Sequence, residues 1–519
     1  MSSTDENADD KAVITARDNK DIAKGAGANF FGFLVRLGSR LPFLVLAVTL
    51  FGPELYGRYN YTITTIELCA AFATFGFKRS LFKFIHDDSY ADKYSIEQVM
   101  MSALCCSLLV GAIFTGIIML SAGLLATIFD YPEMVAGLTS VAPMVMVIAA
   151  LDVILAGTRA TRKMRYEVVS RSIIEPYILL FTMLLLFYLG FDNYGLLMAY
   201  AIALIAALIY SIWAFCHLYS FDKTLRARPD FNLMKKLLRF SGPTAFHDLA
   251  LLFFMRMDIF TVKFFFSEAI LGVYTIAQQF ATSVEKIYQS FYPILSPVMA
   301  KNLVEKDFKT VEKQMIMVSR WILMIQSILV ILCIFYGVEI FDALLLDEQN
   351  FGDLSIALTG AVILFFLMLG ETINGGFGMA DLPIIYRTPL FNPIISLIMI
   401  PIYLLLAYLY SQILGLGPTG IAMALCSTYF IMNMVRVITI NKLYGINMLK
   451  FDVLRVILAA VITAVLFGLI AEYGPFNLLN GVGMLPGIIL IFVLYGFSLM
   501  LIALKKSDKK QLKSKFLSK

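Results

Sequence analysis

Mostly apolar segments about 20 residues long recur along this chain and leave only short polar stretches between them. Because about 20 residues of α-helix cross the roughly 30 Å hydrocarbon core of a bilayer, each segment predicts a membrane-spanning helix. Fourteen such segments span approximately residues 27–51, 56–77, 97–120, 134–157, 172–190, 194–218, 242–266, 269–293, 319–342, 354–376, 390–411, 418–440, 452–471 and 482–504. Hydrophobic residues make up 60% of the chain and charged residues 15%, compared with about 45–50% and about 25% in globular domains. We therefore predict an all-α polytopic membrane protein with about 14 transmembrane helices.

The residue types that metal-dependent enzymes need are scarce in this chain. It contains three histidines, and its six cysteines show no C-x-x-C spacing, so we expect no metal site, cofactor or disulfide framework. The sequence has no GxxxxGK[ST] loop, which excludes nucleotide hydrolysis by that route. The polar segments are too short to fold alone. These features favour a transporter over an enzyme, and no nucleic-acid partner is expected.

The distribution of Lys and Arg gives an independent test of the helix count, because these residues resist translocation. If the N-terminus is cytosolic and the chain crosses fourteen times, 35 of the 42 basic residues lie in or beside cytosolic segments. The predicted outer loops are short and acidic. We therefore predict that both termini are cytosolic and that the number of helices is even.

Two short patterns recur six helices apart and predict an internal repeat. Gly57-x-Tyr59 opens the second helix and Gly272-x-Tyr274 the eighth, while GLLMA opens the sixth helix and GIAMA the twelfth. Six is an even number, so the two copies keep the same orientation, as in transporters with parallel repeats. The predicted parts are a disordered cytosolic tail (1–24), an N-lobe (25–220), a C-lobe (221–450), two further helices (451–504) and a basic cytosolic tail (505–519).

Charged and polar side chains inside the predicted helices concentrate on the first two helices of each lobe. A charge at the bilayer centre costs about 2.5–3.5 kcal/mol, so each needs a partner, a wet cavity or a route to the surface. These side chains are Asn29, Arg36 and Arg40 on the first helix, Glu67 on the second, Asp248, Arg256, Asp258 and Lys263 on the seventh, and Gln278 and Glu285 on the eighth.

The functional interpretation of these residues is a hydrated, electropositive cavity between the lobes. Guanidinium groups match phosphate oxygens bidentately, so Arg36, Arg40 and Arg256 predict an anionic substrate. The full predicted substrate-binding set is Asn29, Arg36, Arg40, Arg256, Lys263, Gln278 and Glu285. Alternatively, the charges pair across the lobe interface and only fix the helix register, and Lys263 extends towards the membrane surface.

Several acidic residues have two open interpretations. Asp248, Asp258 and Glu67 could couple transport to protons or sodium, or could be counter-ions of the arginines. Glu371 and Asn374, near the inner end of the tenth helix, are candidate gate residues.

Three motifs resemble those of the polysaccharide-biosynthesis flippases, members of the multidrug/oligosaccharidyl-lipid/polysaccharide exporter (MOP) superfamily. They are GPELYGRY at 52–59, FGF at 75–77 and GPTGIAMA at 417–424, and the resemblance covers roughly residues 25–505. It implies a flippase of undecaprenyl-pyrophosphate-linked oligosaccharide units in the bacterial inner membrane, serving lipopolysaccharide O-antigen, capsule or exopolysaccharide assembly. Arg36, Arg40 and Arg256 fit the cationic lumen of that family, and the last two helices resemble the lipid-tail groove of lipid II flippases. The polysaccharide polymerase machinery would be a partner, and H⁺ or Na⁺ a coupling ion.

Other functions fit the sequence less well. A cation-coupled multidrug exporter of the same superfamily would need an acidic, aromatic cavity, whereas the first and seventh helices are basic on balance. A glycan polymerase or ligase would need a large outer loop with catalytic residues. A purely structural scaffold would have little reason to keep so many intramembrane charges.

Overall fold

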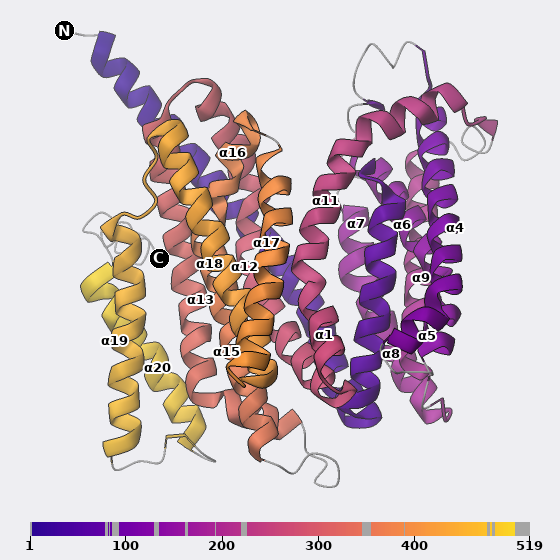
Figure 1. The fold of residues 1–519 in the computed structure, drawn as a ribbon. Coiled ribbons are helices and arrows are strands. Elements are labelled where there is room, and N and C mark those ends of the chain that lie inside the picture. The colour runs from indigo at the N-terminus through magenta and orange to yellow at the C-terminus, as the bar shows by residue number, and fades with distance from the viewer. Residues whose placement is uncertain are drawn as a thin grey trace. The chain divides into compact units, whose positions relative to one another are not determined.

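The computed structural model confirms the all-α membrane fold, because every regular element among the described residues is a helix (Figure 1). The description covers residues 3–77, 81, 84–85, 93–128, 134–160, 165–191, 194–219, 226–344, 354–388, 390–474, 478–479 and 483–503. Within these ranges, the side chains of residues 3–34 and of a few later residues are not described.

Ten spans in the described part of the chain are long and apolar enough to cross a membrane, and they lie at predicted places. They are formed by α4 (Ile96–Ile128), α5 (Met134–Val141) with α6 (Met144–Ala160), α7 (Arg165–Val169) with the π-helix η1 (Ser170–Ile174) and α8 (Glu175–Tyr188), α9 (Gly195–Leu218), α13 (Phe308–Leu344), α15 (Leu354–Phe377) with η2 (Gly378–Ala380) and α16 (Asp381–Arg387), α17 (Phe391–Tyr408) with η3 (Leu409–Ile413), α18 (Gly417–Tyr444), α19 (Phe451–Tyr473), and α20 (Met484–Ser498) with η5 (Leu499–Ala503).

The first, second, seventh and eighth predicted spans, which carry most of the charged and polar side chains, lie in three further long helices. These are α1 (Ser3–Thr74), which contains the first two, α11 (Phe231–Phe265) and α12 (Glu268–Val304). Inside α1 the helix breaks at Gly52, whose φ of 80° and ψ of 158° are not helical. A glycine tolerates this positive φ, and the following Pro53 cannot donate a backbone hydrogen bond. The break separates the first two predicted spans. Residues 3–24 are helical in α1, and their assignment to a disordered tail stays a prediction.

The chain forms two compact units, which are described separately. The N-terminal unit comprises Gly32–Thr275 with Ser396–Ile400, and the C-terminal unit comprises Ile276–Ile395 and Pro401–Lys519 with Met1–Phe31. These units group α11 with the N-terminal helices and do not test the predicted division into two repeats.

In the N-terminal unit, α4, α6 and α9 lie side by side, and the start of α11 packs against α4 (Figure 1). Their shared core includes Val99, Val153, Phe215 and Leu237. Fully buried alanines recur along α9 and α6, and such small residues allow helix backbones to approach closely. The unit is therefore a closely packed helical bundle, which can hold polar side chains in fixed positions.

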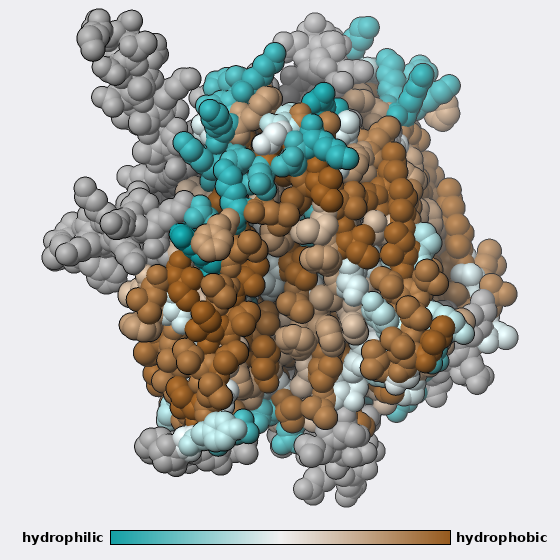
Figure 2. Space-filling view, turned by 60° about the vertical axis from the view of Figure 1, so that its left-hand side comes forward, coloured by the Kyte–Doolittle hydropathy of each residue, from teal (hydrophilic) through white to brown (hydrophobic). Residues whose placement is uncertain are grey.

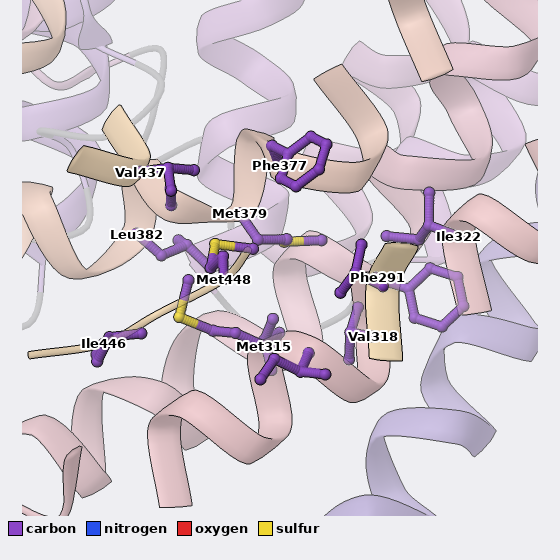
Figure 3. Close-up of a cluster of buried hydrophobic side chains, with 14 of the residues drawn as sticks. Phe291, Met315, Val318, Ile322, Phe377, Met379, Leu382, Val437, Ile446 and Met448 are labelled. Carbon is purple, nitrogen blue, oxygen red and sulfur yellow. The ribbon is translucent and has the colours of Figure 1, made fainter. Parts of the chain in front are cut away.

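In the C-terminal unit, α13, α15 and α18 form the main bundle. Figure 3 shows a buried cluster of this unit, in which Phe291, Met315 and Met379 converge from α12, α13 and η2. The helices α19 and α20 pack against α13 through Phe467, Ile491 and Tyr495. These are the two additional helices that the sequence predicts after the twelve-helix core.

Hydrophobic side chains cover most of the face shown in Figure 2, and hydrophilic ones gather mainly towards one end. Large apolar side chains stay exposed on many helices, among them Leu120, Phe181 and Leu405. An apolar surface of this extent is unfavourable in water and suits contact with acyl chains.

Candidate functional site

A polar cavity of about 410 Å³ lies within the N-terminal unit. Its charged and polar lining comes from six elements: Arg36 and Glu67 on α1, Asp152 on α6, Glu167 on α7, Arg171 on η1, Glu175 on α8 and Tyr200 on α9. Apolar side chains, including Leu252 of α11, complete the wall. A cavity with this lining inside a hydrophobic bundle is the strongest candidate site in the described part of the chain.

Arg171 is held by two carboxylates on different helices. One terminal nitrogen lies 2.5 Å from Asp152 Oδ1 and the other lies 2.8 Å from Glu175 Oε2. The hydroxyl of Thr74 lies 3.4 Å from the second oxygen of Asp152. The widened turn of η1, in which the Glu175 N–H bonds to the Ser170 carbonyl, places Arg171 between these partners. The three charges thus form a fixed ion network in the cavity wall.

Arg36 is the second cavity cation, and its contacts differ from those of Arg171. Its Nε–H is buried and has no hydrogen-bond partner among the described residues. The guanidinium interacts electrostatically with Glu175 and Glu67, and it is also close to the positive charges of Arg40 and Arg171. A buried donor without a partner is costly, so an anion bound here would satisfy a group that the protein leaves unsatisfied.

Arg256 lies on the same face of α11 as the lining residue Leu252, which it follows by four residues, or about one helical turn. It is half-buried, as is Arg40. Arg36, Arg40 and Arg256 all belong to the N-terminal unit, and of the three Arg36 lines the described cavity. Their role in binding substrate stays a prediction.

The described cavity carries two guanidinium and four carboxyl groups, whereas the sequence predicts an electropositive site. Asp152, Glu167 and Glu175 account for the difference. They come from α6, α7 and α8, whereas the prediction was based on the basic residues of the first and seventh predicted helices. The predicted cavity between the lobes is a different space and is not tested by this observation.

Lys263 and Asp258 lie in a separate cluster at the turn between α11 and α12. Lys263 Nζ is 2.9 Å from Glu268 Oε1, and Arg58 Nε is 2.5 Å from Glu268 Oε2. Asp258 is fully buried and accepts a 3.1 Å hydrogen bond from the Tyr274 hydroxyl. Lys263 is therefore paired with Glu268, and the roles of Lys263 and Asp258 in transport stay predictions.

Next to this cluster, the two glycines of the predicted repeat contact each other. A Cβ atom added to Gly57 would lie 2.9 Å from the Gly272 nitrogen, and one added to Gly272 would lie 2.1 Å from the Pro53 carbonyl oxygen. Only glycine fits such a close backbone crossing. The sequence pattern therefore marks a point where α1 and α12 meet.

The predicted gate residues lie in a second polar cluster, inside the C-terminal unit. Glu371 hydrogen-bonds Asn374 and Tyr429 and interacts electrostatically with Glu285. The Asn433 amide donates to Asn374 Oδ1 at 3.4 Å, and the Gln289 amide donates to Glu285 Oε1. The structure thus brings Glu285 of the eighth predicted helix together with Glu371 and Asn374 of the tenth.

Three predicted residues remain to be placed. Gln278 is half-buried on α12, almost two turns before Glu285. The side chains of Asn29 and Asp248 lie outside the described residues. Their predicted roles remain untested.

Sequence reasoning missed the roles of Arg171, Glu167 and Tyr200 in the cavity wall. It assigned Arg171 to a cytosolic segment, just before the predicted span. A usable signal was present, because Arg171 and Glu175 are spaced by four residues and such pairs meet on a helix surface.

We expect Arg171→Gln to lower the stability of the folded protein by about 3 kcal/mol. Removing one partner of a buried ion pair costs about 3–5 kcal/mol, and the Arg171 side chain is 24% exposed, which favours the lower end. Thermal unfolding in detergent measures the change. Arg455→Gln is the matched control, since its 3.8 Å pair with Asp452 is more exposed and worth less than about 1 kcal/mol. Equal unfolding temperatures for the two variants would contradict the proposed network.

Comparison with known families gives one match, to a sequence model described as "Polysaccharide biosynthesis protein". It matches residues 45–349, which is more than half of the chain. No curated protein sequence matches.

Solved structures with the same fold include the lipid II flippase MurJ in an inward closed conformation, which shares 17% identity with a TM-score of 0.68. That match covers 90% of this chain and 98% of the flippase. An inward-facing multidrug resistance MATE transporter of the MOP superfamily gives 15% identity and a TM-score of 0.65, over 79% of this chain and 98% of the transporter. A MOP superfamily transporter from Pyrococcus furiosus gives 14% identity and a TM-score of 0.59, over 82% and 96%. At these identities the likeness concerns the fold.

Proposed function

Since this chain belongs to the polysaccharide biosynthesis protein family and has the fold of MOP superfamily transporters, we propose that it is a flippase for lipid-linked oligosaccharides. Its substrate is an oligosaccharide repeat unit joined to undecaprenyl pyrophosphate. The protein moves the head group from the inner to the outer leaflet of the bacterial inner membrane by alternating access. The product serves assembly of lipopolysaccharide O-antigen, capsule or exopolysaccharide, and both termini face the cytosol.

The observation that supports this proposal best is the buried Nε–H of Arg36, which has no partner among the described residues. Arg36 has two carboxylates within electrostatic range, but Arg40 and Arg171 add positive charge beside it. A pyrophosphate supplies several charged acceptor oxygens, and hydrogen bonds between ionised groups are the strong ones in a low-dielectric site. Arg36 and Arg256 are therefore the proposed head-group contacts.

The flippase proposal also assigns a group for ion coupling and a partner. Glu67 lines the Arg36 cavity and is the proposed coupling or counter-ion group there. Asp258 is a weaker candidate, because the Tyr274 hydroxyl already donates to it. Polysaccharide polymerase machinery on the outer side would consume the flipped substrate.

One observation favours a second candidate function, the export of organic cations. Four carboxyl groups line the cavity beside two arginines, and a drug exporter would use such acids to bind cationic substrates. The paired geometry of Asp152 and Glu175 argues against this use, since Arg171 already occupies both.

Deletion of the gene, followed by analysis of lipid-linked intermediates, separates the two functions. For a flippase we expect lipid-linked repeat units to accumulate on the cytosolic leaflet and surface polysaccharide to be lost. Restoration by the wild-type chain is the control. Unchanged glycans combined with altered sensitivity to cationic dyes would instead support the exporter.

A further inference from the structure

A second, apolar cavity opens on the surface of the N-terminal unit between α8 and α9. It has a volume of about 600 Å³ and is lined by Ile174, Ile178, Ala206, Ile209, Tyr210 and Trp213. We call this the α8–α9 groove. Residues 206–213 span about two helical turns, so the groove runs for roughly 10 Å along the helix. None of its lining residues belongs to the polar cavity around Arg36.

Buried hydrogen bonds fix one end of the groove. The hydroxyls of Ser170 and Ser211 lie 3.0 Å apart, and the Ser211 hydroxyl donates to the Ala207 carbonyl at 2.7 Å. Both serines are fully buried. They hold η1 against α9, so the position of Ile174 relative to Trp213 is set by the fold.

Aromatic rings and a cation gather at the same end. The Trp213 ring lies 5.5 Å from Tyr210 and stacks on His217 at 5.8 Å. The Arg165 guanidinium sits 4.8 Å from the centre of the Tyr166 ring, and Tyr166 in turn contacts Trp213 edge-on at 6.4 Å. Arg165 also interacts electrostatically with Tyr210. An apolar groove thus ends in a belt of aromatic side chains with an exposed arginine.

The groove therefore pairs an apolar surface with aromatic and cationic side chains at one end, in the order in which a lipid presents its acyl chains and its phosphate. Trp and Tyr concentrate at the membrane–water interface, and arginine binds phosphate through several donors. Basic segments beside a membrane helix attract anionic lipids by about 1 kcal/mol per residue, or roughly fivefold.

We propose that the α8–α9 groove binds an anionic glycerophospholipid, with an acyl chain against Ile174, Ile178 and Ile209 and the phosphate at Arg165. The length of the groove suits the upper part of one acyl chain. The inference does not depend on the proposed function.

The chain has two tryptophans, which allows a direct test by fluorescence. In the full chain, Trp321→Phe leaves Trp213 as the only reporter. We reconstitute this variant into mixed vesicles of phosphatidylcholine and phosphatidylglycerol, and bromine on the acyl chains of one lipid or the other quenches a tryptophan in contact with it. At low equal mole fractions, we expect brominated phosphatidylglycerol to occupy the Trp213 site roughly fivefold more strongly than brominated phosphatidylcholine.

Four further variants complete the test. Trp213→Phe leaves Trp321, which packs against the buried core of the C-terminal unit and should show no lipid preference. In the single-tryptophan background, Arg165→Gln should abolish the preference of Trp213, and Arg165→Lys should retain most of it. Arg455→Gln removes a similarly stacked arginine, 4.7 Å above Phe451, and should leave the preference intact.

Three results would overturn the proposal. They are equal quenching by the two brominated lipids, no quenching of Trp213 by either lipid, and a preference that survives in a correctly folded Arg165→Gln protein. Elution as a single species in gel filtration establishes folding, and the comparison of the two lipids in the Trp321→Phe protein needs no Arg165 variant.

Discussion

Arg36→Ala is expected to abolish surface polysaccharide in a strain that lacks its own copy of the gene, with the protein present at normal levels. The guanidinium lines the polar cavity, and its Nε–H is buried without a partner in the described part of the protein. A hydrogen bond to a charged group contributes about 1.5–3 kcal/mol, so its loss corresponds to a roughly 10- to 150-fold weaker head-group interaction. The amount of polymer at the cell surface and the level of lipid-linked intermediates measure the effect.

Conservative and distant substitutions separate binding from folding in this experiment. Arg36→Lys keeps the charge but loses the planar fork, so we expect partial recovery. Arg256→Ala should resemble Arg36→Ala, because it lies one turn from the cavity-lining Leu252. Arg455→Ala, at a partly exposed arginine on α19, should remain active. Full activity in both Arg36→Ala and Arg256→Ala would remove the basis for a phosphate-binding role.

Gly272→Ala is expected to destabilise the protein strongly although it adds a single methyl group. The new Cβ would lie 2.1 Å from the Pro53 carbonyl oxygen and 2.7 Å from the Pro53 carbonyl carbon. Both are backbone atoms, so relief requires a shift of the helix itself, and overpacking of this kind costs about 1–3 kcal/mol or more. We expect a lower unfolding temperature and less monodisperse protein in detergent, measured by a thermal shift and by gel filtration.

Gly116→Ala is the matched control for this substitution. It lies inside α4, and a Cβ added there meets nothing within 4 Å. Replacing a helical glycine by alanine in open space stabilises by about 0.5–1 kcal/mol. The two variants should therefore shift the unfolding temperature in opposite directions, and equal stability would show that α1 and α12 do not cross as described.

The fold could be predicted from sequence because two independent signals coincide. Apolar length located the ten hydrophobic spans, and the clustering of Lys and Arg required an even number of crossings. The break in α1 at Gly52 lies between the first two predicted spans. The four polar spans were harder, since their charged and polar side chains lower the hydropathy on which the prediction of a span depends.

The candidate site could be predicted only in part, because an ion pair between residues on different helices has no characteristic spacing in the sequence. Spacing along α1 identified Arg36, but nothing in the sequence joins Asp152 to Arg171, which come from α6 and η1. The partner of Lys263 was closer at hand, as Glu268 follows five residues later across a short turn. That pair was missed because the two residues belong to different predicted helices.

The π-turn η1 has a consequence for how this site tolerates insertions and deletions. Its Ser170–Glu175 bond spans five residues where a regular helix spans four, so the chain carries one additional residue at this point. Excising any single residue from the turn would restore ordinary winding and rotate the preceding α7 by about 100° relative to Glu175. Glu167 would then no longer face the cavity that Glu175 lines. One additional residue in this helix thus sets the relative orientation of the two carboxyl groups.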